Sequence, residues 1–508
     1  MKLTEQKPPR ARAISLLAAS LSWACLAWTS PGLAAAKATA SGASAAVPAY
    51  EKAVPAPLQS LVNKEEYQVV VDELTDFNHR QTGTDVFLFT GADIALAAGS
   101  PCHKSLLYLT HEYYHNPKVK VAYGQILSGL QDLPPAYKNT NNPWHAKNTD
   151  ALQHKLVKFF THWCTDLPRI RGSYDDGLNP LQHFAWFYYH NPAGQDFVQG
   201  RDPDNQVGFQ FTKNFTLELG KFMDSSASTK TVAEWIADPT IEIHDYQLQK
   251  ASNYHSWNQF FARELIIDKR RQTIPSRPVT MPERDFVVVA PTDCIMNPLL
   301  QVLQDKAEPQ RKYLDNPLQL NTVLDVKGIP LSLAQLLSGV EERYRQPFVG
   351  GSGQSCILMP NTYHHFHAPV DGQIVHASIV KTNTFGYPDW PNWVPTDGNV
   401  ARPGTDFSQF QAFQRGIVII EVTYNNLGKE TKGYVASIPV GLDSVGSVVL
   451  NANVKPGLHV KKGYTELGNF FYGGSIDIIL YSKGLASGVT QVRMGNQINL
   501  FNLGKHAP

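Results

Sequence analysis

The second half of the chain carries short apolar runs that follow one another closely, and this spacing constrains the fold more than any other feature. The runs occupy residues 286–291, 416–424, 434–440, 447–452 and 475–481, with Gly, Asn and Pro between them. Parallel strands need long crossover connections, which gaps of this kind do not favour. The pattern therefore predicts a β-rich region that is largely antiparallel.

The first half has a different pattern. Apolar residues recur at helical spacing in segments such as 65–77, 152–164 and 231–236, and Pro and Gly separate these segments. A short amphipathic helix with Ser256 as its N-cap is also expected over residues 256–265. We therefore expect an α+β protein. A helical domain of unknown role would span residues 61–240, and a β-rich catalytic domain would span residues 241–508.

The N-terminus has the layout of a secretory signal peptide: basic residues, an apolar run that ends near Trp28, and small residues at 34–36. The run is short for a membrane span. We expect residues 1–36 to be a cleaved signal, with an uncleaved membrane anchor as the alternative. Residues 37–60, rich in Ala, Ser, Pro and Lys, read as a linker. The predicted location is exported, either periplasmic or secreted, or membrane-associated.

Composition excludes several classes of protein. A chain of 508 residues is long enough for two or three domains with their own cores. Its formal net charge of +1 gives no electrostatic basis for a nucleic-acid partner. Aromatic residues make up 11% of the chain, which argues against long disordered tracts. The composition is that of a globular protein.

Four cysteines lie beyond the predicted signal: Cys102, Cys164, Cys294 and Cys356. Four cysteines in so long a chain do not form a disulfide framework. One or two disulfides are allowed in an exported protein, and none is required. The spacing of the four residues matches no zinc module.

Residues 111–115 read His-Glu-Tyr-Tyr-His and match the helical zinc motif of metalloproteases. That chemistry needs both histidines on one helical face and a third ligand downstream. Asn116 and Pro117 follow at once and are predicted to end the helix. No third-ligand motif follows, so we interpret the segment as an amphipathic helix end and expect no metal.

The tripeptide Gly473-Gly474-Ser475 leads into an apolar run and suits a protein that cuts its own backbone. The serine hydroxyl would attack the Gly474 carbonyl and convert the amide to an ester, a geometry that glycine permits. β-Elimination and hydrolysis would then leave a pyruvoyl group in place of Ser475. Taken alone, the same tripeptide is a tight start to a strand in most proteins.

A pyruvoyl group is a cofactor made from the chain itself. Its ketone forms a Schiff base with an amine substrate and accepts electrons as CO₂ leaves, as pyridoxal phosphate does. Making it requires a base for the serine hydroxyl and a carboxylate that orients this base.

Residues 363–367 read Tyr-His-His-Phe-His and supply candidate bases. On a helical turn, His364 and His367 would share one face while His365 points away; in a strand, His364 and His367 would face opposite sides. Capping residues before the cluster and a proline after it favour the turn. A core or solvated histidine cluster is the alternative, and we see no nearby carboxylate or cysteine that completes a metal site.

One carboxylate, Asp293, follows an apolar strand and a proline turn at residues 287–292. Alone it is an ordinary turn residue. In order and spacing, however, these motifs resemble the phosphatidylserine decarboxylases and their pyruvoyl-dependent relatives over about residues 240–484. The segments that carry the resemblance are 256–265 with 277–279, then 290–293, 363–372, 438–446 and 462–475.

The resemblance implies a role for each site residue. His367 would be the base that activates Ser475, and Asp293 would orient His367. His364 would assist decarboxylation and reprotonation. The bond between Gly474 and Ser475 would be cut, giving a large β subunit and a small α subunit whose first residue becomes the pyruvoyl cofactor.

The sequence departs from the family pattern in two places. Ile476 stands where the family commonly has Thr, and Asp477 follows it. We expect Asp477 either to point into the site or to face solvent, and to raise the pKa of a nearby histidine. Cys294 follows Asp293 where the family has Gly. These departures weaken any transfer of substrate identity.

The resemblance implies a carboxy-lyase that converts phosphatidylserine to phosphatidylethanolamine. A decarboxylase of a free L-amino acid, including an aromatic one, is the alternative, because some soluble relatives with long N-terminal extensions have that activity. A catalytically inactive member that serves as a binding module is a third hypothesis, and the four site residues argue against it. The expected partners are an amine substrate bearing a carboxylate, the two cleaved subunits and a peripheral membrane contact.

Overall fold

The computed structural model describes part of the chain. The described residues are 102–131, 144, 146–147, 151–152, 155–156, 159–160, 163–167, 193–194, 197, 204–303, 310–314, 317–326, 329–358, 361–380, 415–441, 448–471 and 475–486. The predicted signal at 1–36, the linker at 37–60 and the helix expected at 65–77 lie outside these residues.

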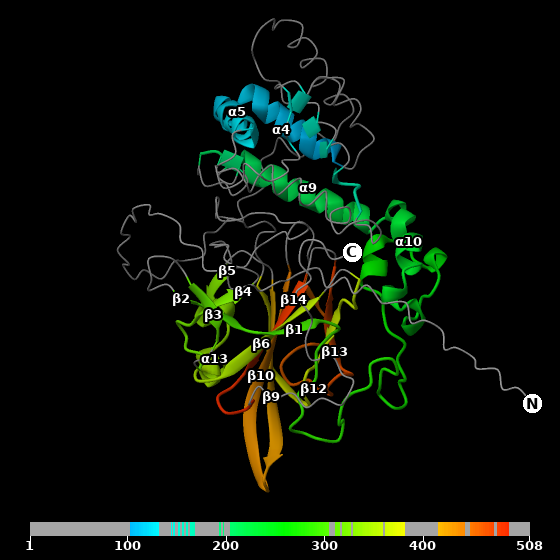
Figure 1. Cartoon of the computed structure of the whole chain (residues 1–508), viewed down its shortest axis with the longest axis vertical. Coiled ribbons are helices and arrows are strands. Elements are labelled where there is room, and N and C mark those ends of the chain that lie inside the picture. The colour runs from blue at the N-terminus through cyan, green and yellow to red at the C-terminus, as the bar shows by residue number, and fades with distance from the viewer. Residues whose placement is uncertain are drawn as a thin grey trace, which may run out of the picture.

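Three long helices form the N-terminal part of the described chain, and Figure 1 shows them stacked at the end of the molecule opposite the long β-hairpin. They are α4 (His103–His115), α5 (Pro117–Gln131) and α9 (Val207–Met223). None of the helices within the described ranges is both long and apolar enough to cross a bilayer.

Short helical elements connect α9 to the β-rich region. They are η2 (Ser226–Thr231), α10 (Val232–Ile236), η3 (Pro239–Ile241), η4 (Ile243–Asp245), η5 (Ala251–Asn253) and α11 (Trp257–Phe261). Ser256 caps α11 as predicted, because its side chain accepts a hydrogen bond from the Gln259 backbone. The helix ends at Phe261, sooner than expected, so Leu265 packs in a different cluster from Trp257.

The largest sheet has seven strands in the order β1-β6-β14-β10-β9-β8-β12. Their bounds are β1 (Ile295–Pro298), β6 (Ser352–Leu358), β14 (Ser475–Tyr481), β10 (Lys429–Gly441), β9 (Arg415–Asn426), β8 (Gly372–Val380) and β12 (His459–Val460). Every described pairing in it is antiparallel. The prediction of a helical region followed by a largely antiparallel β-rich region is confirmed.

Two smaller antiparallel sheets flank the large one. The first has the order β11-β13-β7 and the second β3-β2-β4-β5. Their strands are β11 (Val448–Leu450), β13 (Glu466–Phe470), β7 (His365–His367), β3 (Gln310–Tyr313), β2 (Leu300–Leu303), β4 (Val323–Val326) and β5 (Ile329–Ser332). Helices α12 (Leu333–Leu336), α13 (Glu342–Arg345) and η6 (Gln346–Phe348) follow β5.

Most of the predicted strands exist. The runs at 416–424, 434–440 and 475–481 fall within β9, β10 and β14. The run at 286–291 is not a strand, and that prediction was wrong. Proline 291 has no N–H to give to a ladder, and the segment instead makes single backbone bonds to the histidine segment.

Strand β14 is buried on both faces. Ile476, Ile478 and Leu480 belong to one hydrophobic cluster, which also contains side chains of α4, α5 and α9. Ile479 belongs to a second cluster together with Phe366 of β7. Side chains alternate along a strand, so the three-stranded sheet covers the second face of the large sheet. Each such buried side chain contributes about 1.5–3 kcal/mol of transfer free energy.

Both pairs of cysteines form disulfides, Cys102–Cys164 and Cys294–Cys356. Each closes a loop of the same sequence separation, 62 residues. The first lies at the start of α4 and the second at the end of the segment that carries Asp293. The four cysteines beyond the predicted signal, whose disulfide state the sequence left open, are therefore all paired.

Candidate active site

The histidine cluster lies on a strand, not on a helical turn. His365–His367 form β7, which pairs with β13, and the Phe470 backbone N–H donates to the His364 carbonyl at 2.8 Å. Pairing with a strand a hundred residues away outweighs the local capping residues that favoured the turn. His364 and His367 therefore lie on opposite sides of the segment, and the expectation that they share a face was wrong.

Alternate residues of the segment share a side, and their rings stack. The Tyr363 and His365 rings lie 5.1 Å apart with planes 7° from parallel, and the Tyr363 and His367 rings lie 5.7 Å apart. Tyr363 thus stacks with both His365 and His367. His364 is on the other side, against Phe261, with ring centroids 3.8 Å apart.

Both ring nitrogens of His367 have partners. Nδ1 donates to the Tyr464 carbonyl at 3.2 Å, since a carbonyl only accepts, and Nε2 accepts from the Tyr363 hydroxyl at 2.8 Å. Burial lowers the pKa of His367 to about 4, although the Glu466 charge opposes this. His367 is therefore neutral at pH 7, which is the state that a general base requires.

His364 is also held neutral. Its Nδ1 donates to the Thr362 carbonyl at 2.9 Å, which leaves the lone pair on Nε2. Burial lowers the pKa of His364 well below its usual value, and the positive charge of Arg263 lowers it further.

Arg263 is buried beneath the histidine segment and was given no role from the sequence. Its Nη2 donates to the Asn361 carbonyl at 2.7 Å and to the Thr362 carbonyl at 3.0 Å. Its guanidinium lies 4.5 Å from the centre of the Tyr246 ring. Arg263 and His364 therefore share one acceptor, the Thr362 carbonyl.

His365 joins the strand to its surroundings. Its Nδ1 lies 2.9 Å from a Glu466 oxygen and its Nε2 lies 2.9 Å from the Ala262 carbonyl. Burial acts to raise the pKa of Glu466, but the hydrogen bond and charge of His365 outweigh it and lower the pKa. Glu466 is a carboxylate beside the cluster that the sequence analysis missed, because it comes from β13; its presence in the 462–475 segment was the available signal.

Asp293 is bound by Arg277. The Nε of Arg277 donates to one carboxylate oxygen and Nη2 to the other, both at 2.8 Å. Arg277 also contacts Asp245 at 2.7 Å and Glu242 at 3.1 Å. Burial alone would lower the pKa of Arg277, but the bonds to Asp293 and Asp245 raise it above its ordinary value.

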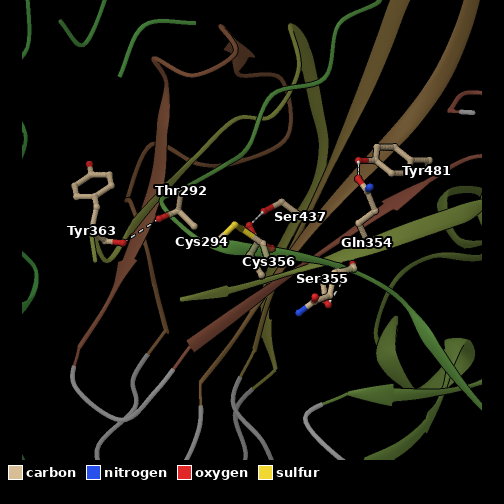
Figure 2. The surroundings of a disulfide bond; sticks show 10 residues. Thr292, Cys294, Gln354, Ser355, Cys356, Tyr363, Ser437 and Tyr481 are labelled. Atoms are coloured by element: carbon tan, nitrogen blue, oxygen red, sulfur yellow. Dashed lines mark hydrogen bonds between the residues drawn. A yellow bond between two sulfur atoms is a disulfide. The ribbon is translucent and has the colours of Figure 1, made fainter. Parts of the chain in front are cut away.

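The hydrogen bonds of the described residues do not join Asp293 directly to His367. The two are connected through their segments, which run side by side. The His367 N–H donates to the Pro291 carbonyl at 2.8 Å, and the Thr292 hydroxyl donates to the Tyr363 carbonyl at 3.0 Å (Figure 2). Although no hydrogen bond joins the two side chains, the negative charge of Asp293 acts to raise the pKa of His367.

The disulfide Cys294–Cys356 anchors the Asp293 segment to β6 (Figure 2). Strand β6 pairs in turn with β14, with Cys356 opposite Asp477. The disulfide therefore joins Cys294, the residue after Asp293, covalently to β6, and β6 is the neighbour of β14, which begins with Ser475.

Ser475 begins β14 and is paired on both sides, with Leu358 of β6 and Gly441 of β10. Gly474, the other side of the predicted cleavage bond, lies outside the described residues. Phe470 ends β13 next to His364, and five residue steps separate it from Ser475. An extended chain covers about 17 Å in five steps, which is the upper limit between the two backbones.

Asp477 does not face solvent. It is fully buried, and the Ser437 hydroxyl donates to its Oδ2 at 2.8 Å. Burial raises the pKa of Asp477 to about 7. Asp477 is not among the groups that shift the pKa of His364 or His367; burial is the largest cause for both, and it lowers them.

The zinc-like motif lies in the last turn of α4, which ends at His115 as predicted. The His111 and His115 rings stack at 4.3 Å, and Nδ1 of His115 bonds the His111 carbonyl at 2.8 Å. Among the described residues, no group of three or more His, Cys, Asp or Glu side chains is arranged to hold a metal ion.

Comparison with known proteins covers the part of the chain that holds the site. Residues 257–499 match a family model described as phosphatidylserine decarboxylase. A phosphatidylserine decarboxylase proenzyme of Clostridium novyi is 25% identical over 303 residues, 59% of this chain and 82% of the relative. Phosphatidylserine decarboxylase proenzyme 3 of Schizosaccharomyces pombe is 27% identical over 276 residues, 54% of this chain and 24% of the relative. Decarboxylase iboD of Amanita muscaria is 25% identical over 232 residues, 45% and 58% of the two chains.

Proposed function

Residues 257–499 belong to the phosphatidylserine decarboxylase family, and we propose on that basis that this chain cuts itself before Ser475 and uses the resulting pyruvoyl group for decarboxylation. Members of the family are carboxy-lyases, so the enzyme class agrees with the sequence analysis. Self-cleavage, the cofactor and the substrate are the proposed parts.

The observation that carries the proposal is the meeting of three segments that are distant in sequence. The segment at 289–293 bonds the histidine segment, the histidine segment pairs with β13, and β13 leads within five residues to Ser475. These are the groups that self-cleavage needs: a hydroxyl, a base and a carboxylate.

The residues present fit a pyruvoyl group at position 475. The backbone at Ser475 is paired on both sides, so a new chain end there would be fixed in place. The group supplies a ketone that reacts with an amine and accepts electrons as CO₂ leaves. The segment that pairs with β13, the strand before Ser475, carries two buried histidines, His364 and His367, that stay neutral at pH 7.

For self-cleavage we assign His367 as the base. Its Nε2 lone pair already accepts a hydrogen bond from the Tyr363 hydroxyl. The Ser475 hydroxyl would therefore deliver its proton either by replacing Tyr363 at this nitrogen or through the Tyr363 hydroxyl. Asp293 acts on His367 through its negative charge and through the position of its segment.

We propose phosphatidylserine as the substrate, as in the names of the relatives. Exposed apolar side chains favour contact with a lipid surface. Phe286 and Leu427 are exposed, and the segments that carry them are joined by a hydrogen bond from the Asn425 N–H to Asp285 at 2.8 Å. Such side chains would insert at the boundary between headgroups and acyl chains.

A free amino acid is the second candidate substrate. One relative, iboD, is named a decarboxylase without mention of a lipid. Asp477 next to the proposed cofactor also departs from the family pattern, and a changed site favours a changed substrate.

Self-cleavage is tested on the purified full chain. Denaturing electrophoresis and intact mass should show two chains, the smaller covering residues 475–508 and blocked by a pyruvoyl group. The Ser475→Ala variant should remain a single chain. A single wild-type chain that keeps its serine under native conditions contradicts the proposal.

The substrate is tested by CO₂ release. Phosphatidylserine vesicles and free L-amino acids are supplied separately to equal amounts of cleaved enzyme. Release from vesicles alone supports the lipid enzyme, and release from an amino acid alone selects the second candidate. A cleaved protein that releases CO₂ from neither fits the inactive binding module.

A further inference from the structure

The helices before residue 257 have no part in the proposed function, although they pack directly on the segment that matches the family. The match begins at Trp257, the first residue of α11, so α9, η2 and α10 lie outside it. Side chains of α9, α10 and α11 nevertheless form one hydrophobic cluster. It contains Leu219, Phe222, Met223, Val232, Trp235, Trp257, Phe260 and Phe261. The helical region and α11 therefore share a core.

Two hydrogen bonds also fix the start of α11 to the helical region. The Trp257 backbone N–H donates to the Ser228 hydroxyl of η2 at 2.8 Å, and both residues are buried. The Asn258 side-chain amide donates to Asp224, the residue after α9, at 2.8 Å. The first N–H groups of a helix have no partner within the helix, so Ser228 supplies an acceptor that α11 lacks. These bonds give the start of α11 a defined position as well as a buried one.

The other end of α11 contacts two histidines of the active-site segment. The Phe261 ring packs on the His364 ring with centroids 3.8 Å apart. The carbonyl of the next residue, Ala262, accepts a hydrogen bond from Nε2 of His365 at 2.9 Å. Helix α11 has five residues and is about 7.5 Å long. A displacement at its start is therefore carried to its end.

Arg263 extends this contact to the backbone of the histidine segment. The Thr362 carbonyl accepts from Nη2 of Arg263 at 3.0 Å and from Nδ1 of His364 at 2.9 Å. The two donors share one oxygen, so a movement of Arg263 moves the acceptor that orients the His364 ring. Residues 261–263 thus fix both the ring of His364 and the carbonyl that selects its tautomer.

His367 is held by other elements. Its ring nitrogens bond the Tyr464 carbonyl and the Tyr363 hydroxyl, and its backbone N–H donates to the Pro291 carbonyl. None of these partners belongs to α11 or to the helical region. A disturbance of α11 therefore acts on His364 more than on His367.

We propose that Ser228 and Asp224 are positioning residues for decarboxylation, which hold His364 in place through α11. This rests on the proposed function, in which His367 serves self-cleavage and His364, by the family resemblance, assists decarboxylation. Neither Ser228 nor Asp224 touches the substrate; both act through α11 and the Phe261 ring. The helical region before residue 257 is then a working part of the decarboxylase.

The first test compares two rates in Ser228→Ala: CO₂ release per cleaved chain, from phosphatidylserine vesicles and from free L-amino acids in parallel, and the appearance of the small fragment. We expect turnover to fall about tenfold, less than the hundredfold that a displacement of 1 Å can cost, while self-cleavage keeps its rate. Ser226→Ala, at an exposed position of the same helix, should change neither rate. Unchanged turnover in Ser228→Ala, or an equal fall in both rates, overturns the proposal.

Asp224 provides a test that does not disturb a buried position, because this residue is exposed. In Asp224→Ala turnover should fall about threefold, which matches the net contribution of one hydrogen bond. Asp224→Asn keeps an oxygen that accepts from Asn258, so it should retain wild-type turnover. If Ser228→Ala fails to fold, these two variants decide alone, and equal turnover in them overturns the proposal.

A second measurement does not depend on activity. In the uncut Ser475→Ala chain labelled with ¹³C-histidine, the ring signal that His364→Gln removes should shift in Ser228→Ala, because the Phe261 ring lies against it. The signal that His367→Gln removes should stay in place. An unmoved His364 signal overturns the proposal. If the wild type stays uncut or releases no CO₂, the proposed function fails, and the ¹³C signals still judge whether Ser228 positions His364.

Discussion

Arg277 binds both carboxylate oxygens of Asp293, and it does so while contacting two further acids, Asp245 and Glu242. The guanidinium is the centre that holds η3, η4 and the Asp293 segment together. Asp293 keeps its place beside the histidine strand because a planar, bidentate donor fixes it.

Arg277→Lys should slow self-cleavage by about tenfold or more, since lysine offers a point charge and cannot bind both oxygens. The rate is followed by the appearance of the small fragment on denaturing gels. Arg271→Lys is the matched control, because Arg271 is exposed and its ion pair is with Asp268, at 3.8 Å, and not with Asp293. Equal cleavage rates in both variants would show that the bidentate hydrogen bonds of Arg277 to Asp293 do not affect cleavage.

The two disulfides allow a comparison at constant loop length. Each closes 62 residues, so chain entropy predicts the same loss of stability, about 4 kcal/mol, for Cys102→Ser with Cys164→Ser and for Cys294→Ser with Cys356→Ser. We expect only the second pair of substitutions to slow self-cleavage, because that disulfide anchors the Asp293 segment to β6. Denaturant unfolding and gel analysis measure the two effects, and equal cleavage rates in both variants would contradict the expectation.

Burial of His367 makes stability depend on pH in one direction. Its folded pKa of about 4 lies below the ordinary value of about 6.5, so the unfolded chain takes up the proton first as pH falls. Stability is fully present above about pH 6.5 and should fall by about 3 kcal/mol as pH drops to 4. In a Ser475→Ala background, His367→Gln should remove this part of the fall in denaturant unfolding. His255→Gln, at an exposed position, should leave it unchanged.

Asp477 acts in the opposite direction. Its folded pKa of about 7 lies above the ordinary value of 3.8, so the folded chain keeps a proton that the unfolded chain loses. Its contribution is present below about pH 3.8 and is lost as pH rises to 7, by about 4 kcal/mol. Asp477→Asn should therefore gain stability relative to wild type as pH rises from 4 to 7. Asp204→Asn, at an exposed position, should show no such gain.

The fold was predictable where the pattern is local. The apolar runs in β9, β10 and β14 have β-branched residues throughout, and the Ser256 cap marks α11 before it starts. The run at 286–291 has a similar composition and is not a strand: it ends at Pro291, which has no N–H for a ladder, and it makes single backbone bonds such as that from the Val289 N–H to the Pro369 carbonyl.

The residues of the site stay a prediction from the sequence, and the geometry expected for them was partly wrong. The sequence selected Asp293, His364, His367 and Ser475. The histidine segment, expected to be a helical turn, is a strand because it pairs with β13. Arg277 binds Asp293 from 16 residues away, and Arg263 and Glu466 bind the histidine segment from 99 and 101 residues away. No local periodicity marks such partners. The two disulfides likewise required the fold, because four cysteines allow three pairings.

Strand β14 lies between β6 and β10 in the interior of the seven-stranded sheet, with both of its edges hydrogen-bonded. A cut before Ser475 would therefore create two polypeptides without creating two separable bodies. The short one would be released only when the sheet itself unfolds, and it could not fold again alone as a central strand. Maturation by cleavage would then be a one-way event: the protein assembles once, as a single chain, and cannot be rebuilt from its products.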